Sequence, residues 1–283
     1  MNRNFHYFVP DDLKTRFLPF YTASEIRRLV EDEPVIVLPV GSVEQHGPHL
    51  SIYTDTLLPT AVLGAALVRL EDDERIYFLP PLAYGVSIEH SGLGGTITLR
   101  STTFLSLIGD ILHSLAQIGM KKVVLLNGHG GNINLLGVAA REAHIDTGMD
   151  IFIASTGALI SPESLSLPKK ECDQGIHAGA VETAVIWKIY PDWVRDDERA
   201  REYPQFHSDL LELSLEGRIP LAWMTRDLSR TGILGDATLA TPELGEQVFT
   251  EMVQALVHIL REIKRFSMPR GEISQEKGAG RHE

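Results

Sequence analysis

Short apolar runs rich in valine and isoleucine alternate along the chain with longer segments of helical period. The runs expected to form buried strands are 34–41, 75–85, 121–131 and 150–156. The segments expected to form helices are 57–73, 101–120, a stretch after 131 through Ala140, and 178–191. Alternation of this kind is typical of a largely parallel sheet with helices on both faces.

The length of the chain suits one large domain. The composition does not change before about residue 265, so a single α/β domain over 1–265 is expected, followed by a flexible tail over 266–283. The stretch 157–176 lacks periodicity and is predicted to form a lid or an active-site loop. The stretch 190–247 mixes charges and turns, and no element is predicted in it.

Composition excludes several classes of protein. The chain carries 38 acidic and 26 basic residues, a formal net charge of −12, and has no Lys/Arg run, so nucleic acid is not an expected partner. Its single cysteine, Cys172, leaves no internal disulfide and no cysteine-based metal site. The N-terminus lacks the apolar core of a signal peptide and no apolar run is long enough for a membrane span. We therefore expect a soluble, cytoplasmic protein that does not bind membranes.

Three clusters of polar residues follow or flank predicted strands. Ligands of open α/β sheets gather beyond the carboxyl ends of the strands, so these clusters are candidates for a common site. The first cluster follows the run 34–41, the second lies in "LNGHGGN", and the third lies in "HAGAVET". Their members are Glu44, His46, His49 and Asp55; Asn127 and His129; and His177 and Glu182.

These residue types point to a metal centre. Imidazole nitrogen combined with carboxylate oxygen, without thiolate, suits Zn²⁺, Mn²⁺ or Fe²⁺. Carboxylates of Glu44, Asp55 and Glu182, with His46 and His129 as neutral donors, are enough for two divalent ions. Two such ions would polarise a carbonyl and make a water acidic enough to attack it near neutral pH. The alternative for each member taken alone is a plain surface or structural role, and His49 in particular fits a structural or supporting histidine.

The glycines of "LNGHGGN" allow a second interpretation. Gly128, Gly130 and Gly131 follow a predicted strand and would cradle a phosphate at a helix start. The segment lacks the Lys-Ser/Thr of a P-loop and the full spacing of a dinucleotide fingerprint. We therefore favour a conformational role, in which positive φ and close approach aim His129 into a crowded pocket.

His177 and Glu182 are five residues apart, which places them about 140° apart if both are helical. They converge only if His177 lies in the preceding loop, and Gly175 and Gly179 leave room for that. In this position His177 would transfer a proton or stabilise an oxyanion. The alternative is a histidine that caps the helix or orients substrate.

Five motifs in order resemble the creatininase (creatinine amidohydrolase) family. They are "GSVEQHGPHLSIYTD", "SIEHSGLGGTITL", "LNGHGGN", "HAGAVET" and "GILGDATLAT", and they cover most of residues 35–245. The resemblance implies an α/β/α sandwich, a two-metal centre and a homo-oligomer, commonly a hexamer built from dimers. It also implies that "GILGDATLAT" has a structural or neighbouring-subunit role.

The resemblance also implies roles for individual residues. Glu44 and His129 would serve one metal and His46 the other, Asp55 would bridge them, and His177 would be the catalytic histidine. In the second motif, His90 would either touch substrate or pack between its neighbours in the loop, and both alternatives stay open.

The chain departs from creatininase itself at two places. Creatininase has an acidic ligand two residues after the histidine of the glycine loop, where this chain has Gly131, and Glu182 is the expected substitute. Creatininase also closes its pocket with tryptophans before the "HAG" motif, whereas "PKKECDQGIHAG" contains none. Creatinine is therefore not the expected substrate.

Three functions are compatible with these patterns. The leading hypothesis is a metal-dependent hydrolase that opens a cyclic amide or another C–N bond of a small polar substrate. The second is hydrolysis of a C–C bond in a cyclic diketone such as 3-dehydro-scyllo-inosose. A hypothesis of another class is a non-enzymatic protein that binds a metal or a nucleotide. Replacing Asp55 separates the classes, because only an enzyme has turnover to lose together with its metal.

Overall fold

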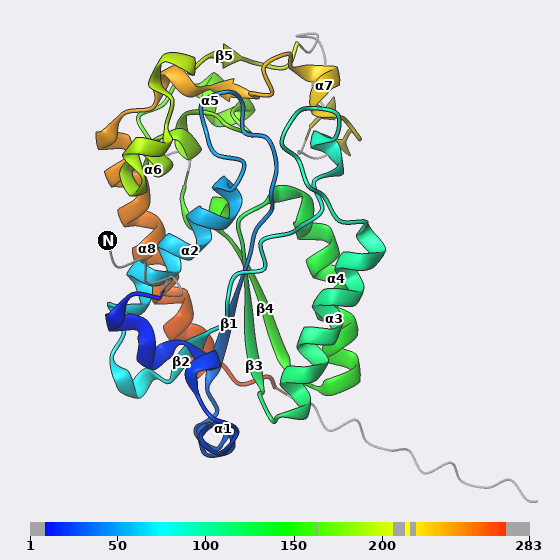
Figure 1. Cartoon of the computed structure of the whole chain (residues 1–283), viewed down its shortest axis with the longest axis vertical. Helices are drawn as coiled ribbons and strands as arrows, with labels where there is room; N and C mark the ends of the chain where they lie inside the picture. Colours follow the sequence, from blue (N-terminus) through cyan, green and yellow to red (C-terminus); the bar gives the residue numbers. More distant parts are fainter. Residues whose placement is uncertain (1–8, 162–163, 206–212, 216–218, 270–283) are drawn as a thin grey trace, which may run out of the picture.

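The computed structural model describes residues 9–161, 164–205, 213–215 and 219–269. Within these ranges the central sheet has four parallel strands in the order β2-β1-β3-β4 (Figure 1). The strands are β1 (Val35–Val40), β2 (Ile76–Phe78), β3 (Lys122–Asn127) and β4 (Asp150–Ser155). Each lies inside a run predicted to be a strand, so the expected parallel sheet is confirmed.

The helices follow the predicted alternation, with shifted ends. Their bounds are α1 (Ala23–Leu29), α2 (Thr54–Leu67), α3 (Ser101–Gln117), α4 (Ile133–Thr147), α5 (Lys169–Gln174), α6 (Ala180–Ile189), α7 (Thr225–Leu228) and α8 (Pro242–Arg265). Short 3-10 turns include η1 (Asp11–Arg16), η5 (Ile88–His90), η6 (Gly130–Asn132) and η7 (Thr156–Leu159). No described helix combines the length and the apolar character that crossing a membrane requires.

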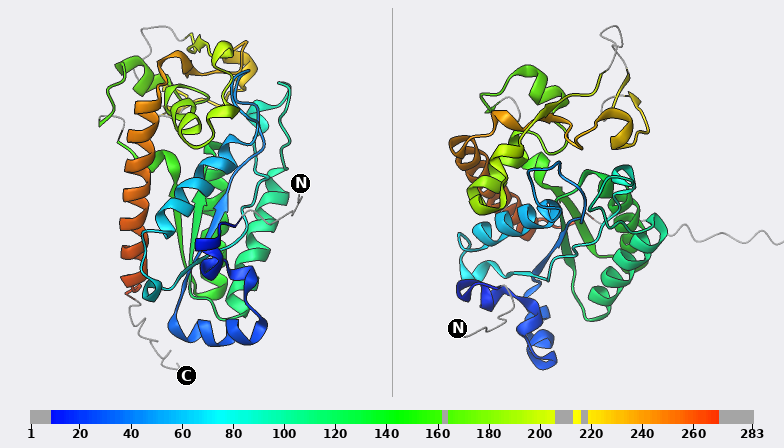
Figure 2. Two further views of the ribbon diagram at one scale, coloured as in Figure 1. Left: turned by 60° about the vertical axis from the view of Figure 1, so that its left-hand side comes forward. Right: turned by 45° about the horizontal axis from the view of Figure 1, so that its top comes forward.

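Helices cover both faces of the sheet and make three layers (Figure 2). Alternate strand residues point to opposite faces, so Val35 and Val37 pack with α2, α6 and α8, whereas Ile36 and Leu38 pack with α3 and α4. Burial on both faces explains why the strands are continuous apolar runs rather than alternating ones. Each fully buried aliphatic side chain contributes about 1.5–3 kcal/mol to this core.

Helix α8 was not predicted, because its start lies in the stretch 190–247. The Thr241 hydroxyl caps it by accepting the Leu244 N–H at 3.1 Å, and Pro242 occupies its first position. It packs mainly against α6 and α2. Its buried stripe is Val248, Met252, Val253, Leu256, Val257, Leu260 and Ile263. The helix ends at Arg265. The tail was predicted over residues 266–283, and its residues 270–283 lie outside the described residues.

The sheet order places a topological switch between β1 and β3. The chain passes from β1 through α2 to β2 on one side, and then through α3 to β3 on the other side of β1. Ligand sites of open α/β sheets lie at the carboxyl ends of strands beside such a switch. The covering segments (residues 169–205 and 219–241) gather over this end of the sheet with the loop that follows β1 (Figure 1). They include the antiparallel pair β5 (Arg201–Glu202) and β8 (Gly235–Asp236), while α5 and η7 interrupt the predicted loop 157–176.

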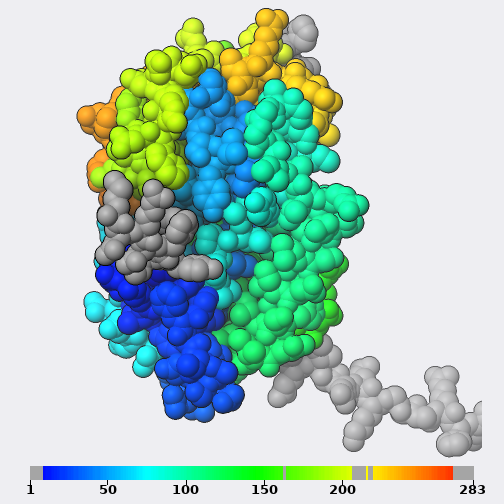
Figure 3. All heavy atoms as spheres, in the orientation of Figure 1, coloured from blue at the N-terminus to red at the C-terminus, as the bar shows by residue number. Residues whose placement is uncertain are grey.

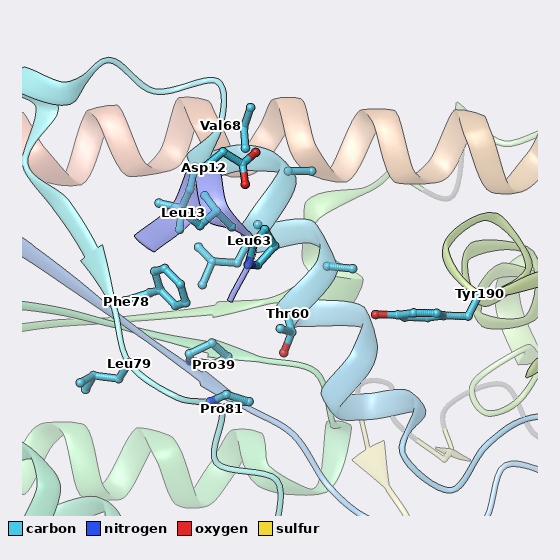
Figure 4. A pocket seen from close by; sticks show the side chains of 15 residues that line it. Asp12, Leu13, Pro39, Thr60, Leu63, Val68, Phe78, Leu79, Pro81 and Tyr190 are labelled. Atoms are coloured by element: carbon cyan, nitrogen blue, oxygen red, sulfur yellow. The ribbon is translucent and has the colours of Figure 1, made fainter. Parts of the chain in front are cut away.

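A cavity of about 290 Å³ lies beside α2, lined also by residues of η1, β1 and β2 (Figure 4). Phe78, Leu79 and Pro81 line it from the strand side, and Thr60 lines it from α2. None of the residues predicted to form the site belongs to this apolar lining, as far as the structure describes it. This cavity is therefore not a candidate for the reaction site.

Candidate metal centre

The first polar cluster lies on the loop between β1 and α2. The loop is held by the Glu44 N–H, which donates to the Ile52 carbonyl at 3.0 Å, and by the Ile97 N–H, which donates to the Val43 carbonyl at 2.8 Å. In the space-filling view this segment lies between the residues near 195 and those near 95 (Figure 3). Asp55 is the second residue of α2, where the helix dipole favours a negative charge.

The second cluster follows β3. The amide of Asn127 fixes the turn by donating to the His129 carbonyl at 2.6 Å. A Cβ at Gly128 would lie 2.1 Å from the Asp55 carbonyl oxygen, so glycine is needed for the close approach of α2. Close approach is thus confirmed, but the expected positive φ at Gly128, Gly130 and Gly131 is wrong, because none of the three adopts it.

The third cluster lies where the covering segments enter α6. His177 is in the loop before the helix and Glu182 is in its first turn, as their convergence requires. The positive φ of this turn falls on Ala178, at 52°, and the Ala178 N–H donates to Glu182 Oε2 at 2.6 Å. The turn therefore aims both side chains at once.

Side chains from the three clusters converge. His46 Nε2 lies 3.1 Å from Asp55 Oδ1, and His129 Nδ1 lies 3.1 Å from Glu44 Oε2 and 3.4 Å from Asp55 Oδ2. Two sets of ligand atoms, each within 4.8 Å of one another, share Asp55: Glu44, Asp55 and His129, and His46, Asp55 and Glu182. A third such set joins Glu44 and His46 to His177. We call Glu44, His46, Asp55, His129 and Glu182 the strand-end cluster.

Hydrogen bonds to the backbone orient both imidazoles of the strand-end cluster. His46 Nδ1–H donates to the Glu44 carbonyl at 3.1 Å, and His129 Nε2–H donates to the Val86 carbonyl at 2.9 Å. In each ring the other nitrogen then faces the carboxylates, and it is the nitrogen that a metal ion would take. This is how metal-binding histidines are usually held.

Three atoms of the strand-end cluster are buried without a hydrogen-bond partner among the described residues. They are Glu44 Oε2, His46 Nε2 and Asp55 Oδ2. Burying such atoms unpaired is costly, and native structures seldom tolerate it without a ligand or water. Carboxylate oxygens and an imidazole nitrogen are also the donor set that Zn²⁺ and Mn²⁺ accept. The residues present therefore fit divalent cations.

The charges of the cluster favour a cation. Burial, followed by repulsion from Glu44, raises the pKa of Asp55 to about 7 although His46 opposes this. Burial lowers the pKa of His46, but the attraction of Asp55 outweighs it and brings the value to about 10. Burial also raises the pKa of the Glu182 carboxyl. The space among these carboxylates thus stabilises positive charge.

His177 stands beside the cluster with its ring fixed. Its Nε2–H donates to the Gln45 carbonyl at 2.7 Å, while its Nδ1 lies 3.7 Å from Glu44 Oε1. Its ring centre is 4.3 Å from that of His46 and 4.1 Å from that of His90. Burial, with these two imidazoles, lowers the pKa of His177 well below its ordinary value, so the ring is neutral.

The other two histidines have different positions. His90 is buried against the cluster, with Nε2 3.4 Å from Glu44 Oε1 and Nδ1 2.7 Å from the Thr225 hydroxyl. Contact of His90 with substrate stays a prediction. His49 lies behind the cluster, where its Nε2 hydrogen-bonds the Thr183 hydroxyl at 2.8 Å, so the structural interpretation is supported.

Two side chains that touch the site were not predicted from the sequence. The Gln45 amide nitrogen lies 3.0 Å from His90 Nδ1 and donates to the Gly232 carbonyl at 3.1 Å. Glu89 Oε1 lies 3.3 Å from His129 Nε2. Each of the two residues directly precedes a histidine in a motif, and this neighbour was the signal that could have identified it. The partner of each side chain lies far away in the sequence, so the neighbouring residues could not predict it.

The last motif, "GILGDATLAT", closes the loop of His177. The Leu234 N–H donates to the His177 carbonyl at 2.9 Å, and the His177 N–H donates back to the Leu234 carbonyl at 3.2 Å. Its Gly232 has φ 86°, and a Cβ there would lie 2.0 Å from Gln45 Oε1. These contacts give the motif a structural role inside its own chain.

Fold and site together define a three-layer α/β protein with a carboxylate–imidazole centre at the carboxyl ends of parallel strands. The family model described as "Creatininase: Creatinine amidohydrolase" matches residues 20–260. The chain therefore belongs to the creatininase family and is a hydrolase of that family, which confirms the resemblance of its motifs.

Curated relatives carry three different names. A mycofactocin precursor peptide peptidase of Mycolicibacterium smegmatis is 33% identical over 260 residues, which cover 89% of this chain and 92% of the relative. A creatinine amidohydrolase of Pseudomonas putida is 29% identical, with coverage of 83% and 92%. A 3-dehydro-scyllo-inosose hydrolase of Thermotoga maritima is 27% identical, with coverage of 88% and 82%.

Solved structures agree with the fold and include metal-containing forms. A mutant creatininase of the Zn-Zn type aligns with TM-score 0.69 and 26% identity, covering 88% of this chain and 98% of the other. A manganese creatininase aligns with TM-score 0.67 and 27% identity, with the same coverage. The three-layer fold of this chain is therefore that of creatininase.

Proposed function

We propose that this hydrolase uses two divalent metal ions to cleave a C–N bond of a small polar substrate. One ion would be held by Glu44, Asp55 and His129, and the other by His46, Asp55 and Glu182, which makes Asp55 the shared ligand. The observation that carries the proposal is the group of buried atoms at Glu44, His46 and Asp55 that lack a hydrogen-bond partner in the described part of the chain. In this scheme Glu182 takes the place of the acidic ligand that is missing at Gly131.

When bound, the two ions would polarise the substrate carbonyl and lower the pKa of a water molecule. The chain itself would position the substrate, exclude water and move protons. His177 is suited to the last task, because Gln45 fixes its Nε2 and leaves Nδ1 free to hold a proton. His177 Nδ1 would accept a proton from the attacking water and deliver it to the leaving nitrogen, which completes the cleavage.

An apolar cavity supports a substrate with an aliphatic part. The cavity has a volume of about 210 Å³, and Glu182 is the member of the strand-end cluster in its lining. Ile160, Leu165, Leu167 and Ile176 supply apolar surface that would take an aliphatic side chain. This suits an amide within a peptide, the class of substrate named for the relative from M. smegmatis, and it keeps cyclic amides as alternatives.

C–C bond hydrolysis is the second candidate. It is favoured by the relative named 3-dehydro-scyllo-inosose hydrolase, which is 27% identical. In that reaction His177 would return the proton to carbon instead of nitrogen. Because the metal centre would be the same, only substrate tests separate the two reactions.

The experiment combines metal analysis with a substrate panel. The full chain, purified without chelator, is expected to hold close to two equivalents of Zn or Mn by mass spectrometry. It should cleave at least one of several short peptides with aliphatic residues or cyclic amides, and lose that activity with chelator and regain it with metal. Full activity without metal would exclude the proposal, and cleavage of a cyclic diketone alone would select the second candidate.

The homo-oligomer stays a prediction. Light scattering of the full chain after size-exclusion chromatography is expected to give the mass of six chains, 31.4 kDa each.

A further inference from the structure

Glu89 is a carboxylate that the proposed reaction does not use, yet it lies against one of the candidate ligands. It belongs to the short turn η5, and its side chain is 18% exposed. Its Oε1 is 3.3 Å from His129 Nε2, on the side of the ring that faces away from Asp55 and Glu44. His129 Nδ1 faces Glu44 and Asp55, so Glu89 contacts the other nitrogen of the ring, on the opposite side.

The glycine loop is shaped to admit this carboxylate. A Cβ at Gly131 would lie 2.3 Å from Glu89 Oε1, 2.5 Å from His129 Nε2 and 2.6 Å from the Val86 carbonyl oxygen. A side chain at 131 and the carboxylate of Glu89 therefore exclude each other. Glu89 therefore reaches into the space that a side chain at position 131 would occupy. This is the position at which creatininase has an acidic ligand and this chain has glycine.

The turn that carries Glu89 is itself anchored. The Thr225 hydroxyl contacts both the Glu89 carbonyl, at 3.1 Å, and His90 Nδ1, at 2.7 Å. The Ser87 N–H donates to the Thr98 hydroxyl at 2.8 Å. These bonds hold η5 against the site, so the backbone of Glu89 is fixed within reach of the His129 ring.

We infer that Glu89 is a positioning residue for His129. Its carboxylate lies 3.3 Å from His129 Nε2, whose hydrogen-bond partners are the Val86 carbonyl and the Ser87 hydroxyl, and its negative charge behind the ring favours the orientation in which Nδ1 faces Glu44 and Asp55. A carboxylate behind a ligating imidazole makes it a better donor, and loss of such a partner typically weakens metal binding by about 10–100-fold. The inference rests on the proposed metal centre. It assigns Glu89 to the ion held by His129 and not to the ion held by His46.

The test measures metal binding, not turnover. Zn²⁺ affinities of the full chain are measured by competition with a chromophoric chelator for the wild type, Glu89→Leu and Glu89→Gln. Glu89→Leu should weaken one of the two equivalents by about 10–100-fold and leave the other within about threefold. Glu89→Gln keeps an acceptor oxygen and should lose less than Glu89→Leu. Ile88→Ala, in the same turn with a side chain 61% exposed, is the matched control and should bind both equivalents as the wild type does.

A second readout reports orientation directly. With ¹⁵N-labelled histidine in the Zn²⁺-loaded chain, the Nε2–H resonance of His129 should shift between the wild type and Glu89→Leu and stay in place in Ile88→Ala. Unchanged affinities and an unchanged Nε2–H resonance in Glu89→Leu, or equal weakening of both equivalents, would overturn the inference. If the wild type binds no metal at all, the proposed function fails instead, so the two failures are distinguishable.

Discussion

Two regions at the same end of the molecule bury carboxylates and treat them in opposite ways. Asp55 in the strand-end cluster and Glu171 in the covering segments are each 3% exposed. Asp55 keeps one oxygen without a hydrogen-bond partner among the described residues. The oxygens of Glu171 accept the N–H groups of Ala180, at 2.7 Å, and Asp236, at 2.9 Å.

Glu202, also in the covering segments but only partly buried, extends the contrast. It accepts from the N–H groups of Arg230 and Thr231, both at 2.9 Å, and from the Ser229 hydroxyl at 2.7 Å. Burial raises the pKa of Glu202, but these donors outweigh it and bring the value to about 2, whereas that of Asp55 is about 7. Burial by itself therefore does not mark a binding site. The number of hydrogen-bond donors around a buried carboxylate decides whether it stabilises the fold or is available to bind a cation.

The largest effect is expected for Asp55→Asn. Asp55 is shared by both candidate sets, so metal content should fall from about two equivalents to less than one, and turnover should fall by more than about 100-fold. The unfolding free energy of the metal-free chain should change little, because one of several mutually repelling buried carboxylates is removed. Metal analysis and urea denaturation measure both. Two retained equivalents would contradict the shared-ligand assignment.

Glu171→Gln should show the reverse pattern. The amide keeps one acceptor and turns an NH₂ toward a backbone N–H, so the unfolding free energy should drop by about 2–3 kcal/mol. Urea denaturation gives this value, and metal analysis at a temperature where the variant is folded should still give the wild-type stoichiometry. Loss of metal without loss of stability would show that Glu171 serves metal binding, as Asp55 is proposed to do, and does not stabilise the fold.

Gly131→Ala tests the crowding within the cluster. The added methyl group would meet Glu89, His129 and the Val86 carbonyl, and should cost about 1–3 kcal/mol of unfolding free energy. Gly137→Ala is the matched control, because a Cβ there meets nothing within 4 Å in the interior of α4. It should stabilise by about 0.5–1 kcal/mol. Similar values for the two variants would show that the glycine loop is not tightly packed.

The smallest effect is a pH dependence at Glu202. Its pKa in the folded chain is about 2, below the ordinary value of 4.5, so its stabilisation is present above pH 4.5 and is lost as the pH falls toward 2. Between pH 6 and pH 3 the unfolding free energy should therefore fall more for the wild type than for Glu202→Gln. Denaturation at the two pH values measures this difference. Equal losses in both proteins would show that the donors around Glu202 contribute nothing.

Much of the fold was predictable because its signals are local. The four strands lie inside apolar runs of the expected length, and polar residues mark the ends of β1 and β3. Helix α8 has an amphipathic pattern as well. The stretch before it mixes charges and turns, so the start of the helix was not predicted. The convergence of the candidate ligands was also predictable, since the carboxyl ends of parallel strands meet at one edge of the sheet.

By itself the sequence determined the parallel sheet and the set of residues able to meet at its carboxyl edge, because strand and helix periods are properties of neighbouring residues. Only the tertiary structure decided how those residues are used. It left one oxygen of Asp55 without a hydrogen-bond partner among the described residues, gave both oxygens of Glu171 backbone donors, and placed Glu89 behind His129 in the space of Gly131. Hydrogen bonds between segments far apart in the chain make that distinction, and no local pattern encodes them.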